Sequence, residues 1–167
     1  DTGVDSNTAQ RIAIHPQSGR GYLPHIRSNV ANRFRLFDTT LFPAVSVLDL
    51  SKNAHLARDR IDLSLGITVA NLPFDVAFSP DGSQIYITNL GSGDVMIHDL
   101  DTGRRVAKID VGHGPRGMAV SPDGNTGYVN NSLTGDVSII DLVAFREIAR
   151  IPVTDIPYSD QIQRGKI

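Results

Sequence analysis

The chain has 167 residues, of which 40% are hydrophobic, with a formal net charge of −2 and no cysteine. This size allows one domain with a hydrophobic core, and the weak charge predicts no nucleic-acid binding, which favours clustered Lys and Arg. The lack of cysteine excludes, for these residues, disulfides, thiolate zinc sites, a cysteine nucleophile and covalent attachment of c-type haem. No apolar run approaches the roughly 20 residues of a membrane-spanning helix, so we expect no membrane insertion.

Residues 1–10 are polar and rich in turn-forming types, which predicts an irregular lead-in. Residues 11–65 form a divergent first copy of a repeat that is regular later in the chain. Its segments 12–14 and 45–50 match segments of the next copy in residue type and order. Between these segments the first copy is longer, which predicts a loop inserted at 24–44, between the second and third strands of a sheet.

Two regular copies follow at residues 73–114 and 115–153, and Pro73–Gly82 returns 42 positions later as Pro115–Gly124. Each copy holds a Ser-Pro-Asp-Gly segment, which predicts a tight turn between its first two strands. A fixed period of this size, built from short strands, is typical of the blades of a β-propeller. In the second copy the apolar alternation predicts strands at 75–78, 84–89, 95–99 and 105–111.

The fold class that follows is all-β: a β-propeller segment of three four-stranded antiparallel blades. Residues 154–167 lack the alternation and the turn segment, so they predict an exit linker that is irregular or helical. A closed propeller typically needs about four to eight blades. A partial ring leaves open sheet faces, so the expected partners are further propeller blades, with self-association as the alternative.

One end of the blades is the better place for a binding site. The connections from second to third strand, and from the fourth strand to the next blade, should emerge together on what we call the loop face, whereas the Ser-Pro-Asp-Gly turns lie opposite. The inserted segment belongs to the loop face and interleaves Arg with Phe, residue types enriched at interface hot spots. It either docks a partner or folds its aromatic rings back over its own blade. The predicted partner-binding residues are His25, Arg27, Arg33, Phe34, Arg35, Phe37, Asn89, His113, Arg116 and Asn131.

No catalytic or metal-binding residue is predicted. The five histidines have no metal-pair spacing, and no Ser, His and Asp are placed to suggest a triad. His98 falls within a strand, which favours a structural role. Asn89 and Asn131 close the second strand of their copies, where an Asn amide is expected to hydrogen-bond the adjoining loop backbone.

The segment Tyr86-Ile-Thr-Asn89, with Ser79–Gly82 before it and Asp94–Asp99 after it, resembles the bacterial YVTN family of β-propeller repeats. Tyr128-Val-Asn-Asn131 departs from that pattern by one residue. Such propellers are similar to methylamine dehydrogenase heavy chains, the haem d1 domain of nitrite reductase and bacterial lactonases. Residues 156–167 resemble the start of a di-haem cytochrome c peroxidase-like domain, in which Arg-Gly-Lys precedes the first haem-attachment motif.

These resemblances imply a non-catalytic scaffold within a larger periplasmic or cell-surface redox protein, docking a cytochrome c-like domain or a redox partner. They imply no cofactor in this chain and a c-type haem in a following domain. The alternative is a propeller enzyme, lactonase-like or quinoprotein dehydrogenase-like, with its site at the channel mouth.

Overall fold

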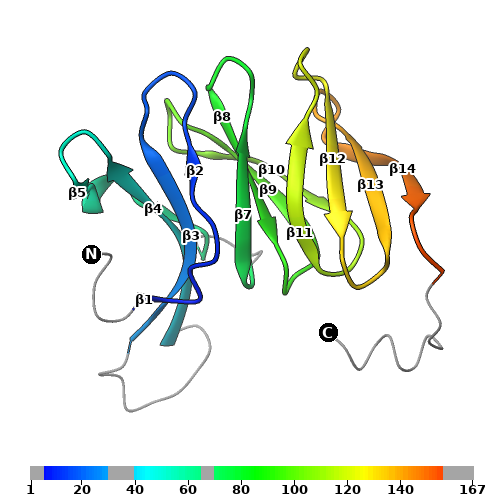
Figure 1. The fold of residues 1–167 in the computed structure, drawn as a ribbon, viewed down its shortest axis with the longest axis horizontal. Coiled ribbons are helices and arrows are strands. Elements are labelled where there is room, and N and C mark those ends of the chain that lie inside the picture. Colours follow the sequence, from blue (N-terminus) through cyan, green and yellow to red (C-terminus); the bar gives the residue numbers. More distant parts are fainter. Residues whose placement is uncertain (1–5, 30–39, 65–69, 156–167) are drawn as a thin grey trace.

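The computed structural model of the chain describes residues 6–29, 40–64 and 70–155. They form three antiparallel sheets that stand side by side like the blades of a fan (Figure 1). The predicted fold class, an all-β partial propeller, is therefore confirmed. Within the described residues, no helix has the length and apolar character needed to cross a membrane.

The second and third blades have the expected four strands each, paired in sequence order. Both Ser-Pro-Asp-Gly turns end on a glycine with positive φ, 73° at Gly82 and 76° at Gly124, which only glycine adopts at no cost. The second blade consists of β7 (Pro73–Phe78), β8 (Gln84–Asn89), β9 (Asp94–Asp99) and β10 (Arg105–Asp110). The third consists of β11 (Pro115–Val120), β12 (Thr126–Asn131), β13 (Asp136–Asp141) and β14 (Arg146–Pro152).

The first blade departs from the regular pattern at both of its edges. Its innermost strand is split into β1 (Ser6–Asn7) and β2 (Ala13–Ile14), which pair with opposite ends of the eight-residue strand β3 (Gly21–Ser28). The prediction that residues 1–10 are irregular is thus wrong for Ser6 and Asn7, which form β1. Two paired residues give no alternation to detect, whereas the free edge of a long strand offers backbone groups that must be paired.

The predicted insertion at 24–44 is mostly strand in its described part. Strand β3 pairs with β4 (Leu41–Asp49) without a break, from Gly21 opposite Leu48 to Ser28 opposite Leu41. The expected loop therefore does not include residues 24–28 or 41–44, and 30–39 lie outside the described residues. Pro24 and Pro43 lie within these two strands, and a proline is accepted in a strand wherever the ladder does not need its missing N–H.

The outer edge of the first blade is also divided. Two short strands, β5 (Ala54–His55) and β6 (Ile61–Asp62), both pair with β4, and a 3-10 turn, η1 (Ala57–Asp59), separates them. The second and third blades have continuous outer strands of six and seven residues at this place. The first blade therefore covers less of its neighbour on the outer side.

Apolar side chains between neighbouring blades form two cores. Each blade presents one face to the blade before it and the other face to the blade after it. Between the first and second blades lie Tyr22, Val45, Val47, Leu63, Ala70, Val76, Ile85, Ile87 and Met96. Between the second and third lie Tyr86, Val95, Ile97, Ile109, Val111, Val129, Ile140 and Leu142.

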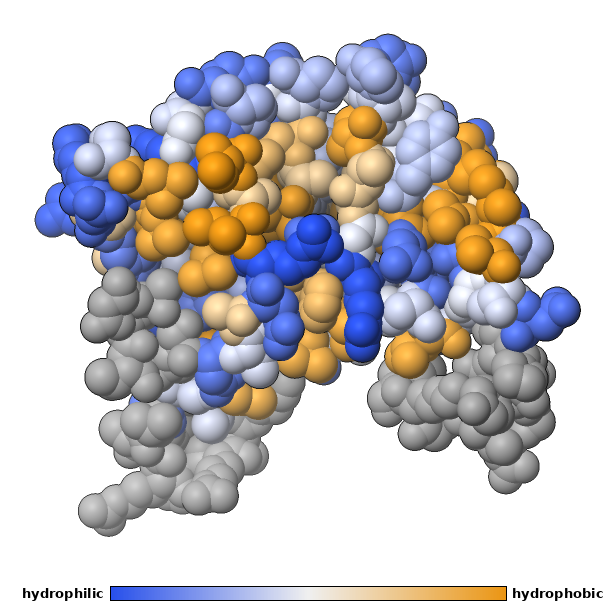
Figure 2. Space-filling model, viewed as in Figure 1, coloured by the Kyte–Doolittle hydropathy of each residue, from blue (hydrophilic) through white to orange (hydrophobic). Residues whose placement is uncertain are grey.

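One face of the third blade has no neighbouring blade among the described residues. Tyr86 and Ile109 of the second blade are 1% and 3% exposed, whereas their repeat equivalents Tyr128 and Ile151 are 43% and 49% exposed. Figure 2 shows hydrophobic surface along this outer edge of the third blade. The same residue type is thus buried in the second blade, which has a neighbour on that side, and exposed in the third.

A carboxylate joins the innermost strands of all three blades. Asp75 on β7 is 9% exposed and accepts a hydrogen bond from the backbone N–H of Met118 on β11. Arg11, which lies between β1 and β2, places its Nε 3.4 Å from Oδ1 of Asp75. Burial raises the pKa of Asp75, and the nearby Arg11 charge acts in the opposite direction.

We expect Ile109→Ala to lower the free energy of unfolding by about 3 kcal/mol, because it empties a packed site between two blades. The same change at the equivalent position, Ile151→Ala, should cost about 1 kcal/mol or less, since half of that side chain already meets solvent. Urea denaturation of both variants measures the difference. Equal losses would contradict the assignment of buried and open faces.

Candidate functional site

The structure divides the predicted partner-binding residues into surface and interior positions. His113 and Arg116 are exposed, at the connection between the second and third blades. Asn89, Asn131 and His25 are each 0% exposed, so in this structure none of them lies on a surface that another protein could contact. Arg27 is half-buried on β3 opposite Phe42. The remaining predicted residues, Arg33, Phe34, Arg35 and Phe37, lie outside the described residues.

Asn89 and Asn131 belong to a network that repeats in the second and third blades. Nδ2 of Asn89 donates to Oδ1 of Asp94 at 2.7 Å, and Nδ2 of Asn131 donates to Oδ1 of Asp136 at 2.6 Å. The partner is thus a carboxylate at the start of the third strand, and not the loop backbone expected from sequence. A cation on the fourth strand completes each set: Lys108 Nζ lies 3.5 Å from Asp94, and Arg150 Nη1 lies 4.0 Å from Asp136.

His25 occupies the same place in the first blade. It pairs with Ala44, just as Asn89 pairs with Asp94, so the carboxylate is missing there. Its Nε2 lies 2.9 Å from Oγ of Ser46. Burial lowers the pKa of His25, and an uncharged imidazole suits this interior position.

A hollow of about 330 Å³ lies on the loop face, between the connections of the second and third blades. Three leucines, Leu72, Leu90 and Leu133, give it apolar walls, and His113 stands beside them. The neighbouring connections are joined by backbone hydrogen bonds, from Gly91 N to Asn71 O and from Leu133 N to His113 O. We call this feature the loop-face hollow.

Leu72 adopts a backbone conformation that leucine rarely takes. Its φ is 51°, whereas its repeat equivalent in the next blade is Gly114, with φ of 67°. A non-glycine residue held in this left-handed region costs on the order of 1–3 kcal/mol, and such strain clusters at functional sites. The apolar side chain of Leu72 is thus kept at the hollow against its own backbone preference.

Two β-bulges point side chains toward each other near the same end of the blades. The register shifts between Pro73 and Asp75, and again between Pro115 and Gly117, which leaves Phe74 and Arg116 without a paired residue opposite. The guanidinium carbon of Arg116 lies 5.6 Å from the centre of the Phe74 ring. Bulges often change the direction of side chains beside functional sites. The bulge between Pro115 and Gly117 places Arg116 close to the loop face.

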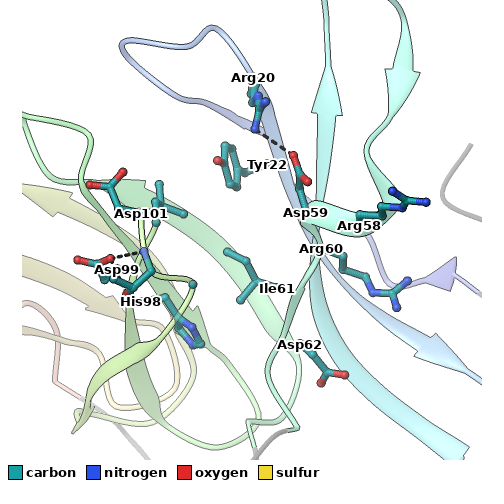
Figure 3. Close-up of a pocket in the computed structure, with 13 residues that line it drawn as sticks. Arg20, Tyr22, Arg58, Asp59, Arg60, Ile61, Asp62, His98, Asp99 and Asp101 are labelled. Carbon is teal, nitrogen blue, oxygen red and sulfur yellow. Dashed lines mark hydrogen bonds and ion pairs between the residues drawn. The ribbon is translucent and has the colours of Figure 1, made fainter.

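A second candidate site lies on the outer side, between the first and second blades, and we call it the inter-blade groove. It consists of two hollows of about 510 and 390 Å³ that share Asp62, His98 and Gly103. Figure 3 shows Arg20, paired with Asp59 at 3.0 Å, and Tyr22 from the first blade facing the turn of the second blade that carries Asp101. The groove exists because the first blade has a divided outer strand.

Sequence reasoning treated His98 as structural, but it lines both hollows of the groove. It is 5% exposed, and burial, with a smaller contribution from Arg105, lowers its pKa to about 4. Its repeat equivalent, 42 positions later, is the fully buried Ile140. That contrast was the signal in the sequence: a polar residue stands where the repeat places an apolar one. Among the described residues, no three His, Asp or Glu side chains are grouped to hold a metal ion.

A family described as "Lactonase, 7-bladed beta-propeller" matches residues 71–167. A comparison with curated proteins found no match. Among solved structures, Kuenenia stuttgartiensis hydrazine synthase is similar with a TM-score of 0.68 and 19% identity, over 82% of this chain and 46% of that one. A protein of unknown function from Bacteroides caccae has a TM-score of 0.63 and 13% identity, over 93% and 50% of the two chains.

The dihydro-haem d1 dehydrogenase NirN is also similar, with a TM-score of 0.51 and 30% identity. The match covers 67% of this chain and 22% of NirN. The chain therefore spans half or less of the length of each of these structures.

Removing the cation of the second-blade network should be costly. Lys108→Met leaves the fully buried Asp94 carboxylate with the Asn89 amide as its remaining described partner, so we expect a loss of about 3 kcal/mol in unfolding free energy. Arg150→Met is the matched control, with an expected cost near 1 kcal/mol because Asp136 is partly solvated. Chemical denaturation distinguishes the two variants. An unchanged unfolding free energy in Lys108→Met would contradict the role of Lys108 as the cation that pairs with Asp94.

The buried imidazole of His98 should make stability depend on pH. Its pKa is about 4 in the folded chain against 6.5 for an unperturbed group, so the unfolded chain binds more protons between these values. Stability should then rise from pH 4 to about 6.5, and His98→Ile should flatten that slope. Thermal melting across this range measures the effect, and an unchanged slope in the variant would argue against a neutral, buried imidazole.

Proposed function

We propose that this chain, which belongs to the lactonase family of seven-bladed β-propellers, acts as a non-catalytic scaffold that docks a partner on its loop face. The observation that carries the proposal is the loop-face hollow with its three leucines and the strained Leu72. Leu72 is half-buried, and an apolar side chain kept partly open to solvent at an energetic cost favours contact with another protein.

The scaffold is proposed to be one part of a larger ring. The family has seven blades and the described residues form three. The open face of the third blade carries the repeat equivalents of residues that are buried in the second. Further blades, from the same protein or a partner, would cover Tyr128 and Ile151 as the third blade covers Tyr86 and Ile109. In such a ring, the cost of Ile151→Ala should rise to that of Ile109→Ala.

The finer part of the proposal concerns the partner. We infer a YVTN-type repeat protein of the periplasm or cell surface, in which the loop face meets a di-haem cytochrome c peroxidase-like domain. Two observations support this inference. One neighbour at 30% identity is a dihydro-haem d1 dehydrogenase. The chain also leaves the third blade on the loop face, where the backbone N–H groups of Val153 and Thr154 donate to Gly135 O.

Binding to a bacterial di-haem cytochrome c peroxidase, followed by calorimetric titration, tests the proposal. Leu133→Asp should weaken binding at least tenfold, because it places a charge in the apolar contact. Leu72→Gly should also weaken binding while its backbone strain is relieved, which separates lost contact from lost folding. Val143→Asp, at a side chain 70% exposed in the turn at the opposite end, is the control and should bind as the unchanged chain does.

Failure has two distinguishable forms. Equal binding by all three variants would remove the loop face as the docking surface. No binding by the unchanged chain would overturn the haem-domain partner.

A propeller enzyme is the second candidate, and the description of the matching family favours it. In this case the exposed His113 beside the loop-face hollow would act at the channel mouth. Hydrolysis of a simple δ-lactone above the uncatalysed rate, abolished by His113→Ala, would support this candidate. Hydrolysis at the background rate would remove it.

A further inference from the structure

The inter-blade groove contains a buried polar side chain without a described partner. Among the described residues, neither Nδ1 nor Nε2 of His98 makes a hydrogen bond. A buried polar atom left in this state destabilises the folded chain. Because the imidazole is uncharged, one of its nitrogens donates and the other accepts.

The repeat itself shows the less costly alternative. Ile140, at the equivalent position of the third blade, is fully buried and packs in the core between the second and third blades. His98 faces the first blade in the same way, and an aliphatic side chain there would need no hydrogen bond. Packing alone therefore does not offset the cost of burying a polar side chain at this position, and a hydrogen bond to a bound group would.

The surroundings of His98 define the chemistry of such a group. Leu63 and Met96 give the smaller hollow an apolar floor, and both are fully buried side chains. Arg104 stands exposed at its rim, with no hydrogen bond or ion pair of its guanidinium to the described residues. The ionisable side chains of this hollow include two arginines, Arg104 and Arg105, against one carboxylate, Asp62, so its fixed charge favours an anion.

The opposite wall comes from the first blade. Figure 3 shows the His98 ring on the second-blade side and Ile61 and Asp62 on the other side of the space. Asp62 Oδ1 accepts hydrogen bonds from Ser64 N and Ser64 Oγ, which holds this carboxylate to its own segment. Arg104 has no such contact of its guanidinium with the described residues, so it is the group that we expect to meet a ligand anion.

We propose that the inter-blade groove binds a small amphipathic carboxylate that packs its apolar body on Leu63 and Met96, hydrogen-bonds His98 and pairs with Arg104. Apolar walls with a few convergent polar groups are the usual composition of a ligand site. The groove lies on the outer side and shares no lining residue with the loop-face hollow. This inference therefore stands or falls independently of the docking function.

The two methionines of the chain provide the probe. Met96 lines the groove, whereas Met118 packs between the second and third blades and serves as an internal control. In the full chain labelled at methionine methyl carbons, titration with benzoate should shift the Met96 resonance saturably and leave Met118 unchanged. Benzyl alcohol should bind more weakly, and benzylamine should not bind, because they lack the charge that pairs with Arg104.

Two variants complete the test. His98→Ile, which installs the residue of the third blade, should weaken benzoate binding at least tenfold while the melting temperature is kept or raised. Arg104→Ala should weaken benzoate binding but leave that of benzyl alcohol unchanged. The proposal is overturned if benzoate leaves Met96 unshifted, which would mean that water alone satisfies the imidazole. It is also overturned if both methionines shift together or His98→Ile binds as before.

Discussion

A single carboxylate ties the innermost strands of the three blades to one another. Asp75 meets the Arg11 guanidinium of the first blade and the Met118 N–H of the third. The apolar contacts between blades have no direction of their own. A buried, hydrogen-bonded carboxylate does have direction, so it fixes the height of each blade against the next. The loop-face hollow and the inter-blade groove both depend on that alignment, since each is built from two blades.

The repeat places pairs of residues, 42 positions apart, in equivalent positions of neighbouring blades. Equivalent residues have the same backbone setting, so a difference between them isolates one cause. Ile109 and Ile151 differ in whether a neighbouring blade covers them. Leu72 and Gly114 share a left-handed backbone but differ in side chain, and His98 and Ile140 share a buried face but differ in polarity. The two functional proposals arise at the latter pairs, where the copies disagree.

The strands of the regular blades could be predicted because a 42-residue period repeats every turn and every apolar alternation. The first blade was harder to predict. A two-residue strand such as β1 leaves no periodic signal, and the extra length of the first copy predicted an inserted loop where β3 and β4 form a long hairpin. The loop face followed from blade topology, but the burial of Asn89 and Asn131 did not, because a strand-end asparagine looks the same whether it meets a loop or a carboxylate. The groove depends on a divided outer strand, whose two-residue segments β5 and β6 leave no periodic signal in the sequence.

The hairpin of β3 and β4 limits how anything can approach the loop face. In the second blade the pairing of the two middle strands ends at Asn89 and Asp94, whereas the first blade adds three further pairs beyond His25 and Ala44. At ~3.3 Å per residue these form a wall about 10 Å high, which projects below the other blades in Figure 1. A flat surface therefore cannot lie across all three blades at once. An incoming domain must be stepped or tilted, so the angle at which it sits is built into the first blade.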